Sequence, residues 1–148
     1  QLAGAFFYVT FTKSTQSLIM SSFTLLVTSA PYSGQSAYSA YRFAVAAVES
    51  THLIKGIFFY QGGALNGSEL QLIPSNEFNL HQAWKQLSAE HNIPLMVCVS
   101  AATKRGITNA QDAGDTDQIH HSLSPEFQSV GLGDLAILLA DSDRLVQF

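Results

Sequence analysis

The chain has one cysteine, Cys98, among its 148 residues. A single thiol cannot form an internal disulfide, so the sequence is typical of a protein from a reducing compartment, and we expect a cytoplasmic location. Metal sites built on paired cysteines are excluded for the same reason. Any function must therefore work without a disulfide framework or a cysteine-based metal centre.

Charged residues are also scarce. They make up 12% of the sequence, about half the share in an average soluble domain, and eleven Asp+Glu outweigh seven scattered Lys+Arg to give a net charge of -4. Binding to a phosphate backbone needs clustered basic residues, so we expect no direct contact with nucleic acid. The low charge leaves uncharged surface for partner subunits and predicts an oligomer.

The first nineteen residues lack the basic start of a signal peptide, and the apolar run at residues 2–11 is too short to cross a bilayer. We expect no membrane association. We interpret residues 1–19 as an extension that arises from upstream translation or from expression, with an added edge strand and a targeting segment as alternatives. The domain itself is predicted to span residues 20–148.

From Met20 onward the hydrophobic period alternates between that of a strand and that of a helix. Strands are predicted at residues 22–29, 56–60, 94–100 and 144–148, and helices at residues 34–50, 78–92 and 133–141, the first capped by Ser36. Strands that are apolar on both faces are typical of a buried parallel sheet. The sequence therefore predicts a single α/β domain with a mostly parallel central sheet and helices on both faces.

Each of the first two helices should bury one stripe of side chains. The predicted stripes are Tyr38, Tyr41, Ala44 or Val45, and Val48 on the first helix, and Leu80, Ala83, Trp84 and Leu87 on the second. The aromatic run Phe58, Phe59 and Tyr60 is expected in the core and at the strand edge.

In parallel sheets, ligands bind beyond the carboxyl ends of the strands. Three loops therefore compete for the site, at residues 29–35, 61–67 and 100–106. Cys98 lies next to the third of these loops. It is either a packed small hydrophobe or a reactive thiol, and the small residues that follow, with Lys104 and Arg105, would favour a thiolate at a helix start.

Other chemistries lack their motifs. No histidine stands in a pattern that would orient it against a nucleophile, and His81 and His91 are predicted on the solvated side of the second helix. The adjacent His120 and His121 do not make a metal site, which needs three or four convergent ligands. The glycine loop at residues 61–67 lacks the lysine of a phosphate loop, so we expect no cofactor.

The stretches "FTLLVTSAPYSGQSAYSAYRFAVAAV", "IFFYQGGALNG", "EFNLHQAWKQLSAEHNIPLMVCVSAATKRGI", "GLGDLA" and "DRLVQF" together resemble the DsrE-like sulfurtransferase family, and most closely its TusD-type subunits from TusBCD sulfur relays. The resemblance spans residues 20–148. Its combination of aromatic strand, glycine loop, cysteine turn and terminal strand is specific, whereas each piece alone is not.

The resemblance implies that Cys98 accepts sulfane sulfur from an upstream donor as a persulfide and passes it to a TusE-like carrier. It also implies TusB-like and TusC-like partners in a heterohexamer, and 2-thiouridine at the tRNA wobble position as the eventual product. Related DsrEFH complexes serve sulfur oxidation instead.

A persulfide relay needs one reactive thiolate and no resolving cysteine, metal, nucleotide or base triad. Backbone N–H groups from Ser100 through Ala101 to Ala102 are expected to stabilise the persulfide, and Lys104 and Arg105 are expected to assist or to contact a partner. Two alternatives remain: a non-catalytic structural subunit of the same type of complex with Cys98 merely packed, and a small-molecule-binding module that uses the glycine loops.

Overall fold

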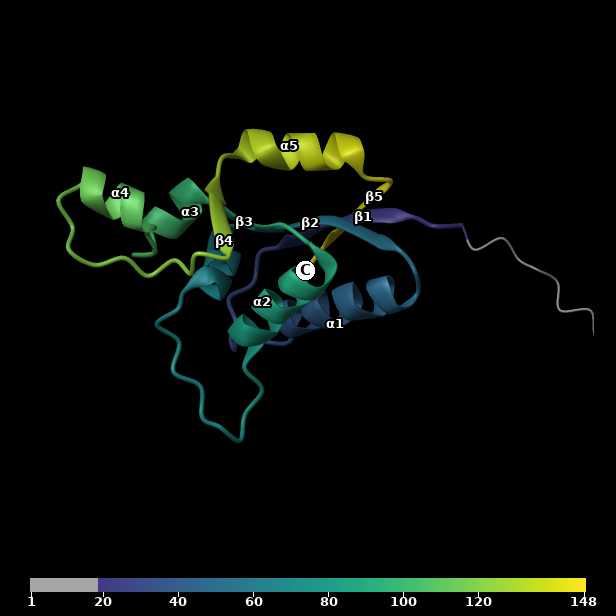
Figure 1. Cartoon of the computed structure of the whole chain (residues 1–148), viewed down its shortest axis with the longest axis horizontal. Coiled ribbons are helices and arrows are strands. Elements are labelled where there is room, and N and C mark those ends of the chain that lie inside the picture. Colours follow the sequence, from purple (N-terminus) through teal and green to yellow (C-terminus); the bar gives the residue numbers. More distant parts are fainter. Residues whose placement is uncertain (1–18) are drawn as a thin grey trace, which may run out of the picture.

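The structure is a computed structural model that describes residues 19–148 (Figure 1). In this range five strands form one sheet in the order β4-β3-β2-β1-β5, and every neighbouring pair is parallel. The strands are β1 (Ser22–Val27), β2 (Leu53–Phe59), β3 (Leu95–Cys98), β4 (Phe127–Val130) and β5 (Arg144–Gln147). The predicted α/β fold with a parallel sheet is confirmed.

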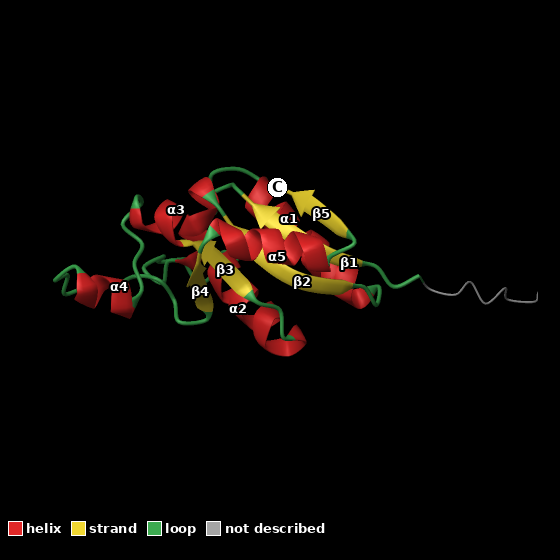
Figure 2. Cartoon of the chain, turned by 90° about the horizontal axis from the view of Figure 1, so that it is seen from above, coloured by secondary structure: helices red, strands yellow, loops and turns green. Residues whose placement is uncertain are grey.

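Helices cover both faces of the sheet, as predicted (Figures 1 and 2). The helices α1 (Ser36–Glu49) and α2 (Leu80–His91) lie on one face, and α5 (Leu132–Asp141) lies on the other. Parallel crossovers are right-handed, and the connection from β4 to β5 runs across the sheet in the opposite direction to the earlier ones. Its helix therefore covers the opposite face.

Three shorter helices lie outside these two layers. They are the 3-10 helix η1 (Gln61–Gly67), which follows β2, and α3 (Val99–Thr103) and α4 (Ala110–Asp115), which follow β3. The sequence analysis predicted neither α4 nor β4 as an element of its own.

Part of the core lies between the central strands and α2. The predicted stripe of α2 is confirmed, because Leu80, Ala83, Trp84 and Leu87 are all buried. The Trp84 ring packs edge-on against Phe59, with the ring centroids 5.4 Å apart. Phe58 and Phe59 are fully buried and Tyr60 is half-buried, as the sequence analysis predicted for this aromatic run.

The predicted stripe of α1 is only partly correct. The fully buried side chains are Ala37, Ala40, Ala44 and Ala47, whereas Tyr38, Tyr41, Val45 and Val48 are half-buried. Alanines let the helix backbone approach the sheet, and the larger side chains turn toward α2, where Tyr41 contacts the Trp84 ring at 5.4 Å. Ser36 is the first helical residue but not the cap, because Gln35 is the N-cap, and the Gln35 side chain accepts no capping hydrogen bond.

The chain end is tied to the start of the sheet. Asp143, next to β5, accepts hydrogen bonds of 2.8 Å from the Ser22 backbone N–H and from the Ser22 hydroxyl. These bonds hold the pKa of Asp143 below its usual range. The edge strand β5 is thereby fixed in register beside β1.

The start of η1 packs directly against the end of β1. The Gly63 N–H donates to the Thr28 carbonyl at 2.9 Å, and a Cβ added at Gly63 would lie 1.9 Å from the Val27 carbonyl oxygen. No side chain fits at this position. The glycine loop therefore serves a close backbone approach to the end of β1.

We predict that Gly63→Ala lowers the free energy of unfolding by about 3 kcal/mol or more, because the backbone of β1 or η1 must move to admit the methyl group. Urea denaturation measures the effect. The matched control is Gly114→Ala on α4, where an added Cβ meets nothing within 4 Å, and which should be neutral or stabilising by up to about 1 kcal/mol. Equal effects of the two substitutions would contradict the close approach at Gly63.

Candidate functional site

Cys98 is both the last residue of β3 and the N-cap of α3. The third strand therefore ends two residues earlier than predicted, because Val99 and Ser100 are already helical. Cys98 pairs with Val130 of β4, and its side chain is 1% exposed. The thiol thus lies at the border between the core and the edge where the carboxyl ends of the strands gather.

Ser100 contacts this thiol. Its side chain is exposed, and its hydroxyl oxygen lies 3.4 Å from the Cys98 sulfur. Ser100 also lines a surface depression of about 220 Å³ together with Tyr60, Gln61, Ala101, Lys104 and Arg105. The residue that contacts the buried sulfur therefore also lines a depression that carries two basic residues.

The two basic residues differ in their contacts. The Arg105 guanidinium donates to the Ala101 carbonyl at 3.0 Å and so caps the end of α3, whereas Lys104 is the C-cap residue itself. Both are exposed, and within residues 19–148 neither forms a salt bridge. Their positive charges are therefore uncompensated in this range.

The first residue of α3 determines which of its backbone N–H groups lack an acceptor within the helix. In an α-helix the N–H groups from the N-cap to the third helical residue have no acceptor within the helix. Because α3 begins at Val99, these donors include Ser100 and Ala101, while the N–H of Ala102 is the first that can bond within the helix, to the carbonyl of Cys98.

Asn66 holds the loops around this edge together. It is 1% exposed, and its side-chain amide donates to the carbonyls of Ser29 (3.1 Å) and Gly63 (2.9 Å). Its side-chain oxygen accepts from the Trp84 indole N–H at 3.2 Å. The amide nitrogen of Asn66 therefore ties η1 to the loop after β1 and to its own Gly63, and the amide oxygen ties η1 to α2.

The Asn66 carbonyl has a further partner that contradicts a prediction. His81, which the sequence analysis placed on the solvated side of α2, is buried and its Nδ1–H donates to this carbonyl at 2.8 Å. The His81 ring also stacks on Phe127 of β4, with the planes 7° apart. The periodicity of α2 does not reveal that η1 and β4 cover the face of the helix on which His81 lies. His91 is exposed, as predicted.

The three loops predicted to compete for the site meet at one edge of the sheet. The first, residues 29–35, joins the second through the bond from Asn66 to Ser29, and η1 packs against α3, which occupies most of the third. The sequence analysis missed Asn66 and Gln61. A single Asn inside a loop of glycines and apolar residues was a usable signal for Asn66, whereas nothing in the sequence marked Gln61.

Within residues 19–148, no group of three or more His, Cys, Asp or Glu side chains converges as a metal site would require. No helix in this range is both long and apolar enough to cross a membrane.

The fold and this edge define a class of protein: an α/β domain with an all-parallel sheet, whose single cysteine ends a strand and starts a helix. The model of the DsrE/DsrF-like family matches residues 21–148, so the chain belongs to that family. The resemblance that the sequence motifs indicated is confirmed.

The chain also matches curated proteins along most of its length. The chain is 42% identical to a protein named sulfurtransferase TusD homolog from Vibrio vulnificus, 44% identical to one from Vibrio cholerae and 45% identical to sulfurtransferase TusD from Yersinia pestis. Each match spans 126 residues, which are 85% of this chain and 96% of the relative.

A solved structure supports the fold. The crystal structure of the YchN protein from E. coli superimposes with a TM-score of 0.69 and covers 87% of this chain and 100% of that one. Sequence identity is 21%, so this similarity shows a shared architecture alone.

We predict that Asn66→Asp destabilises the protein at pH 7 by about 3 kcal/mol, because a buried carboxylate would face the carbonyl oxygens of Ser29 and Gly63 in place of a donor. Burial and these carbonyls raise the pKa of the new carboxyl in the folded state. The variant is therefore closest to wild type below the unfolded pKa of about 3.9 and loses stability as the pH rises. Urea denaturation of both proteins at two pH values measures the gap, and a gap independent of pH would contradict the donor role of the amide.

Proposed function

We propose that this protein is the sulfurtransferase subunit of a cytoplasmic TusBCD-type relay and carries sulfane sulfur as a persulfide on Cys98. The observation that carries the proposal is the position of the only cysteine. It is the last residue of β3 and lies at the edge of the sheet where α/β proteins bind their ligands. The chain around it is 41–45% identical to curated TusD proteins.

The chemistry is a balanced exchange between sulfur atoms. The Cys98 thiolate attacks the terminal sulfur of a donor persulfide, a new S–S bond forms on Cys98, and the S–S bond of the donor breaks. The donor leaves as a thiolate, and no net oxidation or reduction occurs. The same exchange in the next step moves the sulfur to the acceptor thiol and returns Cys98 to its thiolate.

The surroundings of Cys98 suit an anionic sulfur. The amides of Ser100 and Ala101 stand at the start of α3, and Lys104 and Arg105 line the adjoining depression. Backbone amide donors and positive charges are groups that bind anions.

The proposed partners are TusB-like and TusC-like subunits in a heterohexamer, an upstream sulfur donor and a TusE-like acceptor, with 2-thiouridine at the tRNA wobble position as the product of the relay. The names of the curated relatives favour this branch over the sulfur-oxidation role of DsrEFH-type complexes. The alternative is a structural subunit in which Cys98 is merely packed. The observation that favours it is that Cys98 is only 1% exposed.

The first test is intact-mass spectrometry of the assembled complex after incubation with a cysteine desulfurase and cysteine. We expect wild type to gain the mass of one sulfur atom on this subunit, and Cys98→Ser to gain none while it assembles normally, because its hydroxyl cannot attack sulfane sulfur. A gain on Cys98→Ser, or none on wild type within the complex, would refute the proposal.

The second test separates a reactive from a packed thiol. We predict that iodoacetamide labels Cys98 in the native protein at a rate that does not change in low urea, because local movement of Ser100 exposes the sulfur. A packed cysteine would be labelled only through global unfolding, at a rate that rises with urea. Cys98→Ser is the blank for both measurements.

A further inference from the structure

A second concave surface lies at the same edge of the sheet as Cys98. It has a volume of about 470 Å³, and we call it the aromatic cup; its lining residues are Tyr32, Gly34, Gln35, Tyr38, Glu77, Phe78 and Leu80. They come from the loop after β1, the start of α1 and the end of the loop that joins η1 to α2. Nothing in the proposed sulfur chemistry uses this cup.

The cup is held in shape by its own contacts. The Tyr32 hydroxyl donates to the Phe78 carbonyl at 2.9 Å and accepts from the Leu80 N–H at 3.1 Å. The Phe78 ring packs against Tyr38 and Tyr41, with centroids 5.2 Å and 5.5 Å apart. These aromatic contacts continue through Tyr41 into the core, so the cup is preformed and a ligand need not order it.

The charge of the cup favours a cation. Glu77 is its only acidic or basic lining residue within residues 19–148, and residues 56–84 contain Glu69 and Glu77 but no Lys or Arg. Rings with a nearby carboxylate attract ammonium and guanidinium groups. Amides at the start of α1 carry partial positive charge, so the cation belongs on the side of Glu77 and Phe78.

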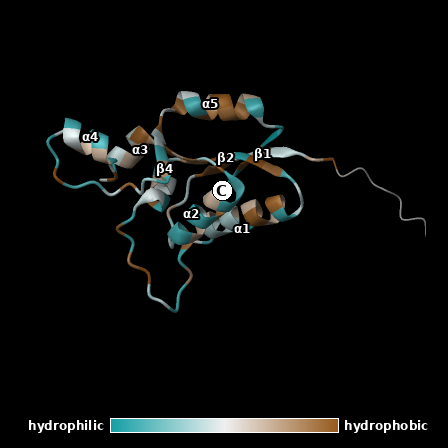
Figure 3. Cartoon of the chain, in the orientation of Figure 1, coloured by the Kyte–Doolittle hydropathy of each residue, from teal (hydrophilic) through white to brown (hydrophobic). Residues whose placement is uncertain are grey.

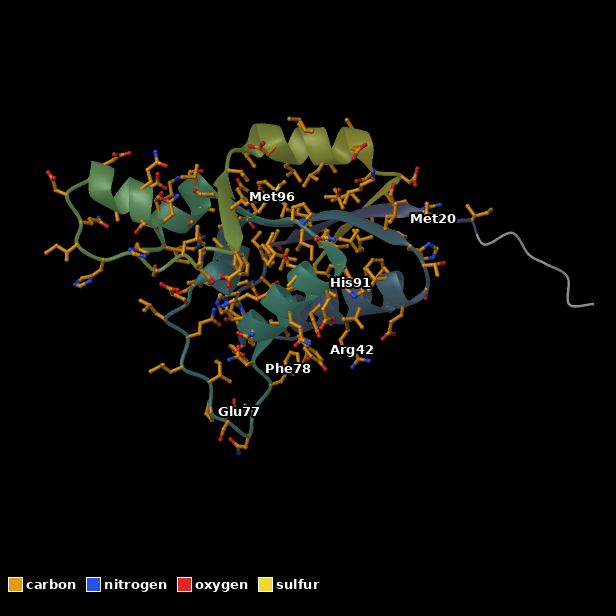
Figure 4. The ribbon with its side chains drawn as sticks, in the orientation of Figure 1. Met20, Arg42, Glu77, Phe78, His91 and Met96 are labelled. Atoms are coloured by element: carbon orange, nitrogen blue, oxygen red, sulfur yellow. The ribbon has the colours of Figure 1, made fainter. Side chains whose placement is uncertain are left out.

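The Tyr38 ring already attracts one guanidinium. Arg42, one turn along α1, lies 6.0 Å from the centroid of this ring and donates to the Tyr38 hydroxyl at 3.3 Å. The hydroxyl raises the pKa of Arg42. Figure 4 shows Arg42, Glu77 and Phe78 on the same side of the molecule, with Glu77 on the projecting loop.

Apolar side chains extend this surface along the loop between η1 and α2. Leu70 is 70% exposed and Leu72 is 94% exposed on the loop between η1 and α2, which projects from the body of the molecule and carries hydrophobic stretches (Figures 1 and 3). A smaller hollow of about 260 Å³ joins Tyr32 to Leu65 and Leu70. Along η1, Leu65 lies about 8 Å from Gln61, which lines the depression beside Cys98.

We propose that the aromatic cup receives a lysine or arginine side chain of the acceptor protein that takes sulfur from Cys98, while Leu70 and Leu72 contact an apolar side chain beside it. The proposal rests on the function proposed above. It assigns the surface between the cup and the depression to one docking partner, because both lie at one edge of the sheet and the smaller hollow shares Tyr32 with the cup and borders η1 at Leu65.

The test measures binding of the TusE-like carrier to the assembled complex that carries Cys98→Ser, so that affinity is separated from sulfur transfer. We expect Glu77→Lys to weaken binding about tenfold, and wild-type affinity to fall with added salt more steeply than that of the variant. The matched control is Glu90→Lys, the same charge change at an exposed site on the far end of α2. Phe78→Ala should weaken binding as well, without the change in charge.

Every outcome of this test either supports or overturns the proposal. Loss of affinity with Glu77→Lys, but not with Glu90→Lys, in an intact complex supports the proposal. Unchanged affinity, no binding of the carrier to the parent complex, or dissociation of subunits by Glu77→Lys would overturn it, and dissociation would assign the cup to a neighbouring subunit. Failure of Cys98 to load with sulfur would refute the proposed function separately, since the binding measurement does not need sulfur.

Discussion

The contact between the start of η1 and the end of β1 is the constraint on which the site depends. Gly63 allows the two backbones to touch, and Asn66 then fixes η1 to the loop after β1 and to Trp84. With η1 in this place, Gln61 points to the depression beside α3, and Leu65 lies beside the loop that carries the aromatic cup. One glycine and one buried amide thus position both surfaces.

Much of this architecture is predictable from the sequence, because hydrophobic period reports burial directly. The strands β1, β2 and β3 are apolar on both faces and were predicted within a few residues, and the stripe of α2 was predicted in full. The place of Cys98 at the edge followed from the same reasoning. Its chemistry did not follow from period or spacing, and was indicated only by resemblance to a family.

The parts that the sequence did not reveal depend on contacts between distant residues. β4 has four residues, of which only Phe127 is fully buried, so it carries too little pattern to be recognised as a strand. His81 is polar and was placed in solvent, although the Asn66 carbonyl and the Phe127 ring stabilise it in the interior. On α1, the period alone could not choose the alanine stripe over the neighbouring tyrosine stripe, because that choice depends on how closely the helix approaches the sheet.

Burial of Cys98 gives the proposed relay a reason for its two surfaces. A persulfide that stood freely in solvent would transfer its sulfur to any small thiol, because such exchange needs only access and an attacking thiolate. Cys98 is 1% exposed, so transfer would require a partner that is held at this edge long enough for the sulfur to become accessible. The preformed cup at the same edge would supply such holding without contact with the reacting atoms. Selectivity would then come from docking, while the reactive edge itself stays small and needs only one sulfur, a few amides and two positive charges.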